Sequence, residues 1–269
     1  MPLLVCATPI GNLEDVTLRV LRELAEADLV LCEDTRRTKV LLERHGIDAK
    51  LLSYHEHNEA ERTAQALPRL VAGERIALTS DAGLPGVNDP GARLIEAALE
   101  AGVQVTVLPG PSAVETALVA SGLVGERYRF VGYLPRTESG RAGLWAELAG
   151  WADAVVAFES PRRLPASLRS LAQVSPDRRV AVCRELTKRF EEVVRGSAAE
   201  LAETFAEPPR GEITVVIGPA EAEAEQGAEA DALAAVSELV EAGIGRRQAA
   251  DLVSRLTGHS RNRLYRASL

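Results

Sequence analysis

One stretch of sequence, T-S-D-A-G-L-P-G-V-N-D-P-G at residues 79–91, constrains this chain more than any other. It follows a short apolar run and precedes an Ala/Leu-rich helical pattern, and strand, Gly/Pro loop and helix is the order of a ligand-binding turn in an α/β sheet. Its glycines permit a positive φ or the close approach of a ligand, and its prolines stiffen the loop. Such a loop can also be a plain connection. Two similar turns elsewhere in the chain favour the binding function.

The first half of the chain alternates short apolar runs with amphipathic patterns, which predicts a mainly parallel sheet with helices on its faces. Strands are expected at residues 3–7, 29–32, 51–53, 76–78 and 103–108, and helices at 16–27, 38–44, 61–72, 92–101 and 112–120. In the first helix we expect Leu18, Val20, Leu21 and Leu24 to face the core. Ser112 is placed to be the N-cap of the last of these helices.

The composition loosens near residues 122–127, where we place a domain boundary. A second α/β unit follows, and the segment 184–196 within it is too short for a helical crossover, so we expect some antiparallel pairs. The predicted domains are an N-terminal α/β domain at 1–121, a second α/β domain at 122–219 and a small helical domain at 230–269.

The C-terminal part has two opposite charge regions. Residues 221–241 are strongly acidic, whereas the six arginines that follow face a single acidic residue, Asp251. We interpret residues 218–230 as a linker and expect three short helices at 232–241, 246–256 and 260–268. This helical unit resembles a helix-turn-helix bundle that contacts nucleic acid, and the alternative is a packing module with solvated arginines.

Composition excludes several classes of protein. A net charge of −8 argues against a simple polyanion binder. No apolar run reaches the ~18 residues of a membrane span, and the N-terminus lacks signal-peptide features, so we expect a cytoplasmic protein. The cysteines Cys6, Cys32 and Cys183 lie in apolar runs without metal-ligand spacing. We expect them to be buried, reduced thiols, and we expect no metal site.

Three Gly/Pro turns, at residues 7–12, 79–91 and 109–113, are expected to meet along one edge of the first sheet. The dinucleotide and P-loop fingerprints are absent. Backbone N–H and C=O groups at this edge could nevertheless hold an adenosine-like ligand.

Seven motifs carry a resemblance to a known family. They are A-T-P-I-G-N-L-E-D, C-E-D-T-R-R-T, S-Y-H-E-H-N-E, S-D-A-G-L-P-G-V-N-D-P-G, P-G-P-S-A, C-R-E-L-T-K-R-F-E-E and R-G-E, in this order. Together they resemble the ribosomal RNA small subunit methyltransferase I family. These are the cytidine 2′-O-methyltransferases of the tetrapyrrole methylase-like (class III) S-adenosylmethionine-dependent group. The match runs from residue 3 to about residue 219, and the tail R-N-R-L-Y-R resembles that family's C-terminal helical domain.

The resemblance implies an α/β fold of two tetrapyrrole methylase-type domains with the methyl donor, S-adenosylmethionine, in the cleft between them. It implies a homodimer that methylates a cytidine in the decoding region of 16S rRNA, within the 30S subunit. The donor-binding positions that it implies are Pro9, Asp81, Gly83, Leu84, Ser112, Ala113 and Phe158. The family often carries Thr where this chain has Leu84, so a backbone contact would survive there and a hydroxyl contact would not.

A ribose hydroxyl is a poor nucleophile, so a general base or a cation beside the developing alkoxide would help the transfer. The candidates for such a base are Glu33, Asp34 and His55, with Glu56 and His57 nearby. If residues 54–59 are extended, the two histidines face opposite ways and only one can serve the site. Alignment of the reactants alone could also suffice.

Basic residues supply the candidate RNA contacts. Arg36 and Arg37 could hold phosphates bidentately, and the alternative is a structural cluster of ion pairs and caps with Glu33 and Asp34. Further candidates are Arg162, Arg163, Lys188 and Arg189 in the second domain, and Arg246, Arg247, Arg261 and Arg263 in the tail. Each alone is more often a solvated charge. Two rival functions stay open here, a small-molecule methylase that acts on a tetrapyrrole and an RNA-binding assembly factor without catalysis.

Overall fold

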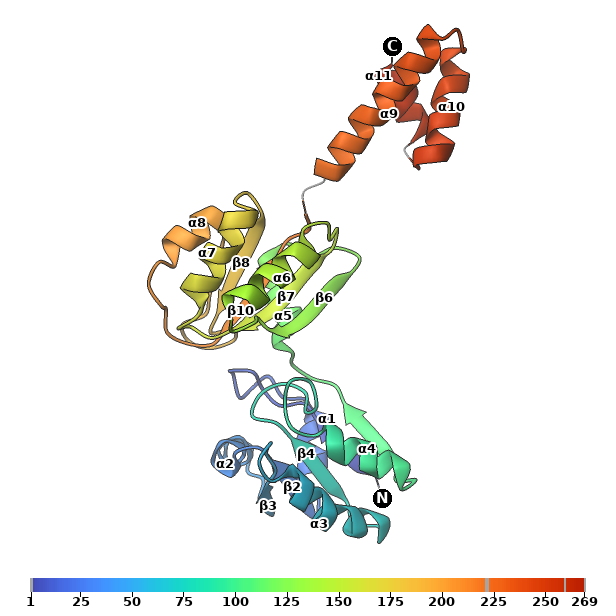
Figure 1. Ribbon diagram of the computed structural model, residues 1–269. Helices are drawn as coiled ribbons and strands as arrows, with labels where there is room; N and C mark the ends of the chain where they lie inside the picture. Colours follow the sequence, from blue (N-terminus) through green and yellow to red (C-terminus); the bar gives the residue numbers. More distant parts are fainter. Residues whose placement is uncertain (1, 221–222, 259, 269) are drawn as a thin grey trace.

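The computed structural model describes residues 2–220, 223–258 and 260–268, and the side chains of 223–230 are not described. Two five-stranded sheets, each with its own helices, follow one another along the chain, and a group of three helices ends it (Figure 1). Each half buries one or more apolar clusters of its own. The predicted fold class is confirmed.

The first sheet is parallel throughout and has the strand order β3-β2-β4-β1-β5. Its three central strands are fully buried, as expected for apolar runs covered on both faces. The strands are β1 (Leu3–Cys6), β2 (Leu29–Cys32), β3 (Leu51–Ser53), β4 (Ile76–Thr79) and β5 (Val105–Leu108). The helices between them are α1 (Leu18–Ala25), α2 (Thr35–Arg44), α3 (Glu59–Val71) and α4 (Ala92–Glu100).

Helix α1 corrects one detail of the expected core. Thr17 caps the helix through its side chain, which accepts a hydrogen bond from Val20 N, and both Val20 and Leu24 are buried as predicted. Leu18, however, is 84% exposed. At 3.6 residues per turn, Leu18 lies nearly opposite Val20 around the helix, so the two cannot share one buried face.

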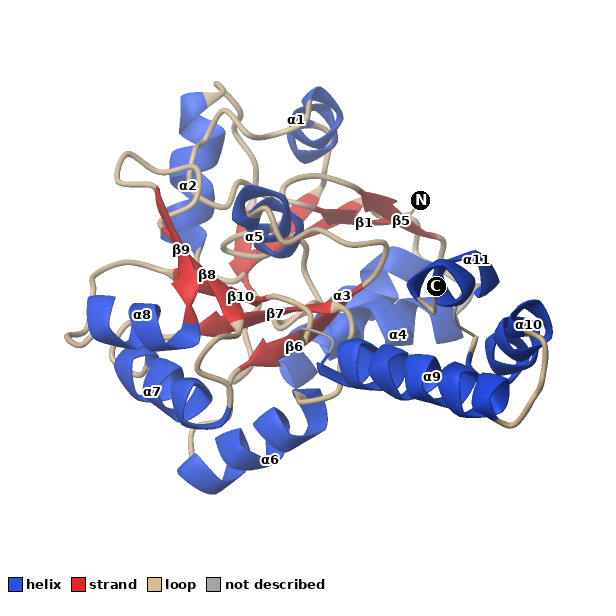
Figure 2. Ribbon diagram, turned by 90° about the horizontal axis from the view of Figure 1, so that it is seen from above, coloured by secondary structure: helices blue, strands red, loops and turns tan. Residues whose placement is uncertain are grey.

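The second sheet has the order β6-β7-β10-β8-β9. Strands β6 and β7 are parallel, and the other neighbours pair antiparallel, which confirms the expected antiparallel pairs. The strands are β6 (Tyr128–Tyr133), β7 (Ala154–Glu159), β8 (Arg179–Arg184), β9 (Glu192–Ser197) and β10 (Ile213–Ile217). Helices α6 (Glu138–Leu148), α7 (Leu164–Val174) and α8 (Ala198–Thr204) lie together on one face (Figure 2).

Helix α5 (Ala113–Ser121) follows β5 in sequence but packs on the second sheet. Its buried residues Val114, Ala117 and Leu118 join the cluster that contains Val156 and Ala181, on the face opposite to α6–α8 (Figure 2). Judged by its contacts, the chain therefore leaves the first sheet and joins the second one just before α5. The domain limits 1–121, 122–219 and 230–269 stay a prediction.

All three cysteines are free and buried, as predicted. Burial raises the pKa of Cys6 to about 12, and it raises that of Cys32 and of Cys183 to about 11. At these values the thiolate is scarce at neutral pH, so none of the three is a nucleophile.

Helices α9 (Glu223–Glu241), α10 (Arg246–Thr257) and α11 (Arg261–Ala267) pack around a small cluster that includes Val236, Ala250 and Leu264. They lie apart from the two sheets (Figure 1). Helix α9 begins at Glu223, so the linker expected up to residue 230 is wrong for 223–230. Alanine and glutamate are strong helix formers, and their preference prevails there. Residues 221–222 of that linker lie outside the described residues.

Candidate active site

A cavity of about 840 Å³ lies where the first sheet meets the second. Each of the three Gly/Pro turns contributes to it, since β4, β1 and β5 are neighbours and their carboxyl ends lie at one edge. The first-domain lining is Ile10, Glu33, Arg37, Asp81, Ala82, Gly83, Leu84, Val87, Asn88, Asp89 and the run 109–115. The predicted meeting of the three turns is confirmed.

The turns hold one another through the backbone. Thr8 N–H donates to the Gly83 carbonyl at 2.8 Å, and Gly83 N–H donates back to Thr8 at 3.0 Å. The Thr8 hydroxyl adds a bond of 3.0 Å to the carbonyl of Ser80. These bonds fix the central loop against the first turn, so the cavity wall is largely preformed.

Carboxylates gather on the first-domain wall. Asp81 accepts a hydrogen bond from Asp34 N–H at 3.0 Å and forms an ion pair with Arg37 at 3.2 Å, while Asp81 N–H lies 3.4 Å from the Glu33 carboxylate. Burial raises the pKa of Glu33, and the charge of Asp81 raises it further. Burial and then the charge of Glu33 raise the pKa of Asp89 to about 6. With Arg37 as the one cation beside Glu33, Asp81 and Asp89, this part of the wall favours a cationic ligand.

Aromatic side chains form the opposite wall. The Phe158 ring packs edge-to-face against Phe130 and Tyr133, with centroids 5.0 and 5.5 Å apart. The second-domain lining is Tyr128, Phe130, Tyr133, Phe158, Glu159, Ser160, Pro161, Cys183, Leu186 and the run 211–214. A planar apolar ring can pack against such a wall.

A bulge in β6 brings Tyr133 into this wall. Phe130 pairs with Val156 and Tyr133 with Phe158, so β6 carries one extra residue between the two pairs. Gly132, at φ +68°, supplies the left-handed backbone. In a regular strand Phe130 and Tyr133 would face opposite sides. Sequence reasoning missed Tyr128, Phe130 and Tyr133; the Tyr-x-Phe spacing in a strand was the available signal for the first two.

The candidate bases separate in the structure. Glu33 lines the cavity, whereas Asp34 is the N-cap of α2 and accepts a 2.8 Å bond from Arg36 N–H. Asp34 also forms a 2.7 Å ion pair with Arg36, and these bonds lower the pKa of Asp34 to about 2. Asp34 and Arg36 therefore form a structural cluster of a cap and an ion pair, which was the alternative to phosphate binding by Arg36. Because its pKa is lowered, Asp34 is a weak base.

His55 lies outside the cavity lining. The segment after β3 is a turn and not an extended strand, so the prediction that His55 and His57 face opposite ways does not apply. Their ring centroids lie 6.0 Å apart in an edge-to-face arrangement. The backbone N–H of His55 donates to the Asn58 side chain at 2.8 Å. Its Nδ1 is buried without a hydrogen-bond partner among the described residues.

Known proteins resemble this chain both in sequence and in fold. The family model of the tetrapyrrole (corrin/porphyrin) methylases matches residues 2–202, which is most of the chain. The chain belongs to the tetrapyrrole methylase family. Among solved structures of this fold, the methyltransferase CobJ superposes with a TM-score of 0.63 at 23% identity, covering 81% of this chain and 94% of that one. The uroporphyrin-III C-methyltransferase from Thermus thermophilus, complexed with S-adenosylhomocysteine, superposes with a TM-score of 0.56 at 20% identity. The superposition covers 81% of this chain and 97% of that one. At these identities the likeness concerns the fold alone.

The more similar tetrapyrrole methylases carry the name ribosomal RNA small subunit methyltransferase I. The protein of Mesorhizobium japonicum is 43% identical over 266 residues, which cover 98% of this chain and 90% of that protein. The protein of Thermotoga maritima is 44% identical over 216 residues, which cover 80% of this chain and 97% of that protein. The predicted resemblance is confirmed.

The seven donor-binding positions implied by this family lie close together, and all except Pro9 line the cavity. Pro9 is buried behind the lining, and its neighbour Ile10 takes the place in the wall. Ser112 precedes α5 as expected, but its hydroxyl donates to the Glu115 carboxylate instead of capping the helix backbone. Tyr128 donates to the same carboxylate at 2.6 Å.

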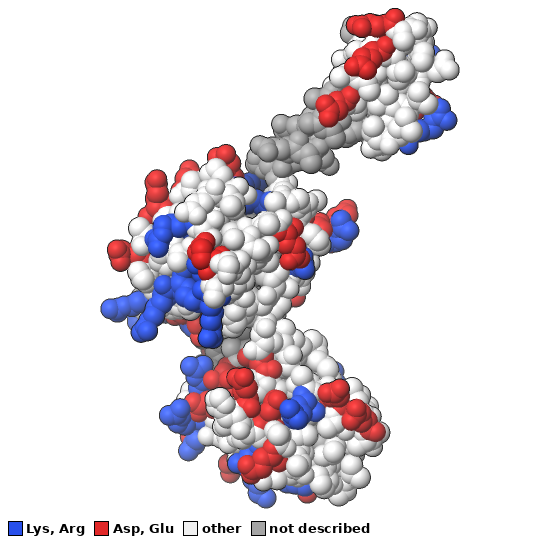
Figure 3. Space-filling view, in the orientation of Figure 1, with Lys and Arg blue, Asp and Glu red and all other residues white. Residues whose placement is uncertain are grey.

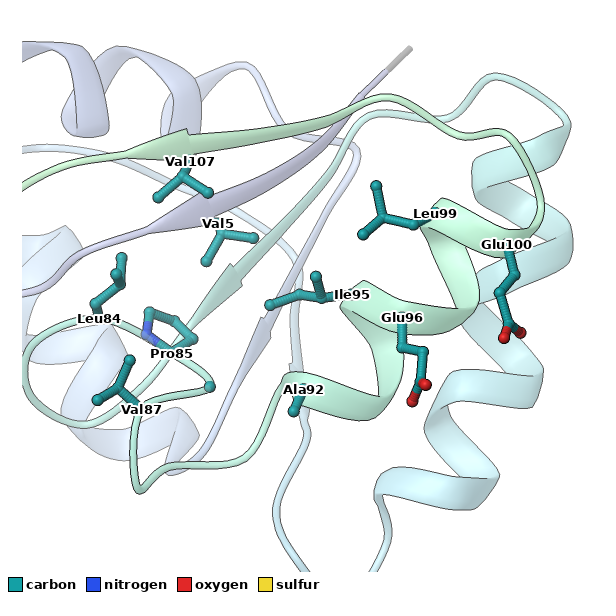
Figure 4. Close-up of a pocket in the computed structure, with 11 residues that line it drawn as sticks. Val5, Leu84, Pro85, Val87, Ala92, Ile95, Glu96, Leu99, Glu100 and Val107 are labelled. Carbon is teal, nitrogen blue, oxygen red and sulfur yellow. The ribbon is translucent and has the colours of Figure 1, made fainter. Parts of the chain in front are cut away.

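Leu84 stands between the cavity and a second, apolar hollow of about 620 Å³ (Figure 4). In Figure 4 its side chain lies on the side of Val5 and Val107, and it packs against the core cluster of the first sheet. Because its side chain packs against this cluster, we expect Leu84 to meet a ligand mainly through its backbone. The loss of a hydroxyl relative to Thr would then remove no contact with the ligand.

Leu84→Thr is expected to leave the affinity for S-adenosylmethionine within about twofold of the wild type, because the Leu84 side chain packs against the core cluster of the first sheet. Isothermal titration calorimetry measures this directly. A gain or loss of tenfold or more would show that the side chain at 84 contacts the ligand.

The basic residues differ in how far their charge is already paired. Lys188 bonds Glu185 and Glu212, each at 2.9 Å, and Arg163 forms a 2.7 Å ion pair with the buried Glu159. Arg162, in contrast, is exposed and has no acidic partner in the described parts of the chain. Figure 3 shows Lys and Arg side chains gathered on the second domain beside its junction with the first.

In the tail, too, several charges are used internally. Arg246 donates to the Ser268 carbonyl, Arg247 lies 5.8 Å from the Tyr265 ring centroid, and Arg261 reaches Asp251 at 3.8 Å. Arg263 is exposed. The sequence therefore identified the basic module, and the structure shows that Arg246, Arg247 and Arg261 contact other parts of it.

Proposed function

We propose that this protein is an S-adenosylmethionine-dependent methyltransferase that methylates the ribose 2′-oxygen of a cytidine in the decoding region of 16S rRNA. The observation that carries the proposal is the cavity in which a carboxylate wall from the first domain faces an aromatic wall from the second. The names of the relatives support rRNA over a tetrapyrrole as the substrate. These relatives are about 40% identical to this chain and match almost its whole length.

The cavity residues fit the donor in charge and shape. S-adenosylmethionine supplies an electrophilic methyl group on a cationic sulfonium. Asp81 and Asp89 would favour the positive charge, and Phe158 would pack against the adenine. The backbone groups of Gly83 and Ala113, which border the cavity, would supply donors and acceptors for the polar edges.

Transfer to the ribose needs alignment and the removal of one proton. The preformed walls would orient the donor toward the ribose, and such alignment is expected to contribute most to the displacement. Glu33 is the carboxylate that we assign as proton acceptor from the 2′-hydroxyl, because it lines the cavity and burial raises its pKa, which makes it a stronger base than an ordinary glutamate. Arg37 holds Asp81 in place through their ion pair.

A base that must be deprotonated predicts an acid limb in the pH–rate profile. Because the pKa of Glu33 is raised, the rate of methyl transfer is expected to fall as the pH drops through that raised value, above the range of an ordinary glutamate. Glu33→Gln should remove this limb and lower kcat by about 10²–10⁴-fold. Single-turnover rates between pH 5 and 9 measure both effects. Asp89→Asn is the control, and loss of the limb in that variant alone would assign the base to Asp89.

The test of the whole proposal is transfer of radiolabelled methyl from S-adenosylmethionine to under-methylated 30S subunits, with naked 16S rRNA beside them. The methylated ribose is mapped by its resistance to alkaline cleavage. We expect label at one decoding-region cytidine, and the better substrate identifies whether assembled subunits or free RNA are modified. Donor binding without any label on RNA would move the protein to the small-molecule methylases, and absence of donor binding would favour a non-catalytic assembly factor.

The resemblance also implies a homodimer in the cytoplasm. The edge strand β5 supports a self-association surface, since Val107, Leu99 and Val87 beside it are each at least half exposed. Sedimentation equilibrium tests the oligomeric state. No helix in the described ranges has both the length and the apolar character of a membrane span.

A further inference from the structure

The short connection between β8 and β9, residues 185–191, presents an aromatic ring to solvent. Phe190 is 66% exposed, more than any other aromatic side chain of the described residues. Exposure of one apolar side chain is ordinary by itself, so the surroundings of the Phe190 ring decide whether it has a function.

The loop that carries Phe190 has a fixed and strained backbone. Glu185 and Thr187 have φ of +51° and +63°, which is costly for a β-branched residue such as Thr187. The Glu191 carboxylate accepts a 2.5 Å bond from Thr187 N–H, and Lys188 ties Glu185 to Glu212. Strain of this kind persists only where the surroundings hold the backbone, so the ring is preorganised.

The same loop borders the cavity and touches the first domain. Leu186 lines the cavity, and Asn12 N–H donates to the Thr187 hydroxyl at 3.0 Å. A Cβ on Gly11 would stand 2.5 Å from Lys188 Cγ, which shows how closely the loop sits against the first turn. Phe190 therefore stands a few residues from the cavity wall, at the seam of the two domains.

An arginine packs against the ring. The Arg189 guanidinium lies 5.5 Å from the Phe190 ring centroid, and Arg189 is exposed and has no acidic partner within the described residues. Its neighbour Lys188, by contrast, is neutralised by two glutamates. The guanidinium covers one face of the ring, which leaves the other face for a nucleobase, and a guanidinium without a carboxylate partner can bind the adjoining phosphate.

We propose that Phe190 is a stacking platform for an unpaired nucleobase of the RNA substrate next to the methylated nucleotide, with Arg189 at the adjoining phosphate. The inference rests on the proposed function, since it requires an RNA substrate. It adds a base contact outside the cavity, which helps to place one ribose of a structured RNA before the donor.

The test uses the full chain and under-methylated 30S subunits. Phe190→Ala is expected to weaken binding to the subunits and to lower kcat/KM for them by about 5- to 150-fold, the range measured for a single stacked base. The affinity for S-adenosylmethionine should stay unchanged. Phe190→Trp should restore binding, and its fluorescence should be quenched on addition of RNA. Val174→Ala, an exposed apolar change on α7 of the same domain, is the matched control.

The outcomes separate the two proposals. If wild-type protein neither binds nor methylates RNA, the proposed function fails and the stacking platform fails with it. If the wild type methylates RNA and Phe190→Ala does so equally well, only the platform is overturned. A third outcome would also overturn the platform: Phe190→Ala changes the oligomeric state, and the protein still binds RNA with wild-type affinity. The ring would then contact a second copy of the chain instead of RNA.

Discussion

Removal of residues 221–269 is expected to weaken RNA binding by about 100-fold and to leave the affinity for S-adenosylmethionine unchanged. The helices α9–α11 form their own apolar cluster, and no residue described in them lines the cavity. Exposed arginines such as Arg263 and Arg266 belong to this module, and each phosphate contact that is lost also reduces the salt dependence of binding. Filter binding of 16S rRNA at several salt concentrations, beside calorimetry with the donor, measures both quantities.

The structure determines where this truncation is made. A cut at residue 232 would leave the first part of α9, which begins at Glu223, attached to the second domain. A full-length Arg266→Gln variant is the control for charge alone. If donor affinity falls together with RNA affinity after truncation, the helices are not a separate module.

Asp81→Asn is expected to lower the affinity for S-adenosylmethionine by about 10- to 100-fold, equivalent to ~1.4–2.7 kcal/mol. Asp81 lines the cavity and pairs with Arg37, so the change removes one negative charge and leaves the Arg37 guanidinium facing a cationic ligand. Calorimetry with S-adenosylmethionine and with S-adenosylhomocysteine, which lacks the sulfonium charge, separates the two effects. The loss should be larger for the cationic ligand.

The matched control for Asp81 is Asp34→Asn. Asp34 lies on the same cluster but outside the cavity lining, and asparagine is an equally good N-cap for α2. Its donor affinity should stay close to that of the wild type. Unchanged affinity in Asp81→Asn, or an equal loss in both variants, would remove Asp81 from the donor site.

Local sequence was sufficient for the order of elements and for the meeting of the three Gly/Pro turns. Apolar runs and Gly/Pro turns are local patterns, and parallel strands bring their carboxyl ends to one edge, so the turns were expected to meet there. The motif resemblance then pointed to Asp81, Gly83 and Ser112 within these turns. The motif resemblance gave Phe158 its place from the second domain. The antiparallel part of the second sheet followed from the short β8–β9 connection.

Contacts between residues far apart in sequence determined the rest. The bulge at Gly132 turns Tyr133 into the cavity, and α5 packs on the second sheet although it follows the first. Lys188 forms an ion pair with Glu212, which lies far from it in the sequence, so its charge is neutralised. Sequence by itself therefore determined which residue types stand at which strand ends. Tertiary structure alone decided which charges are paired and which rings are exposed, because pairing and burial depend on neighbours that periodicity and spacing do not identify.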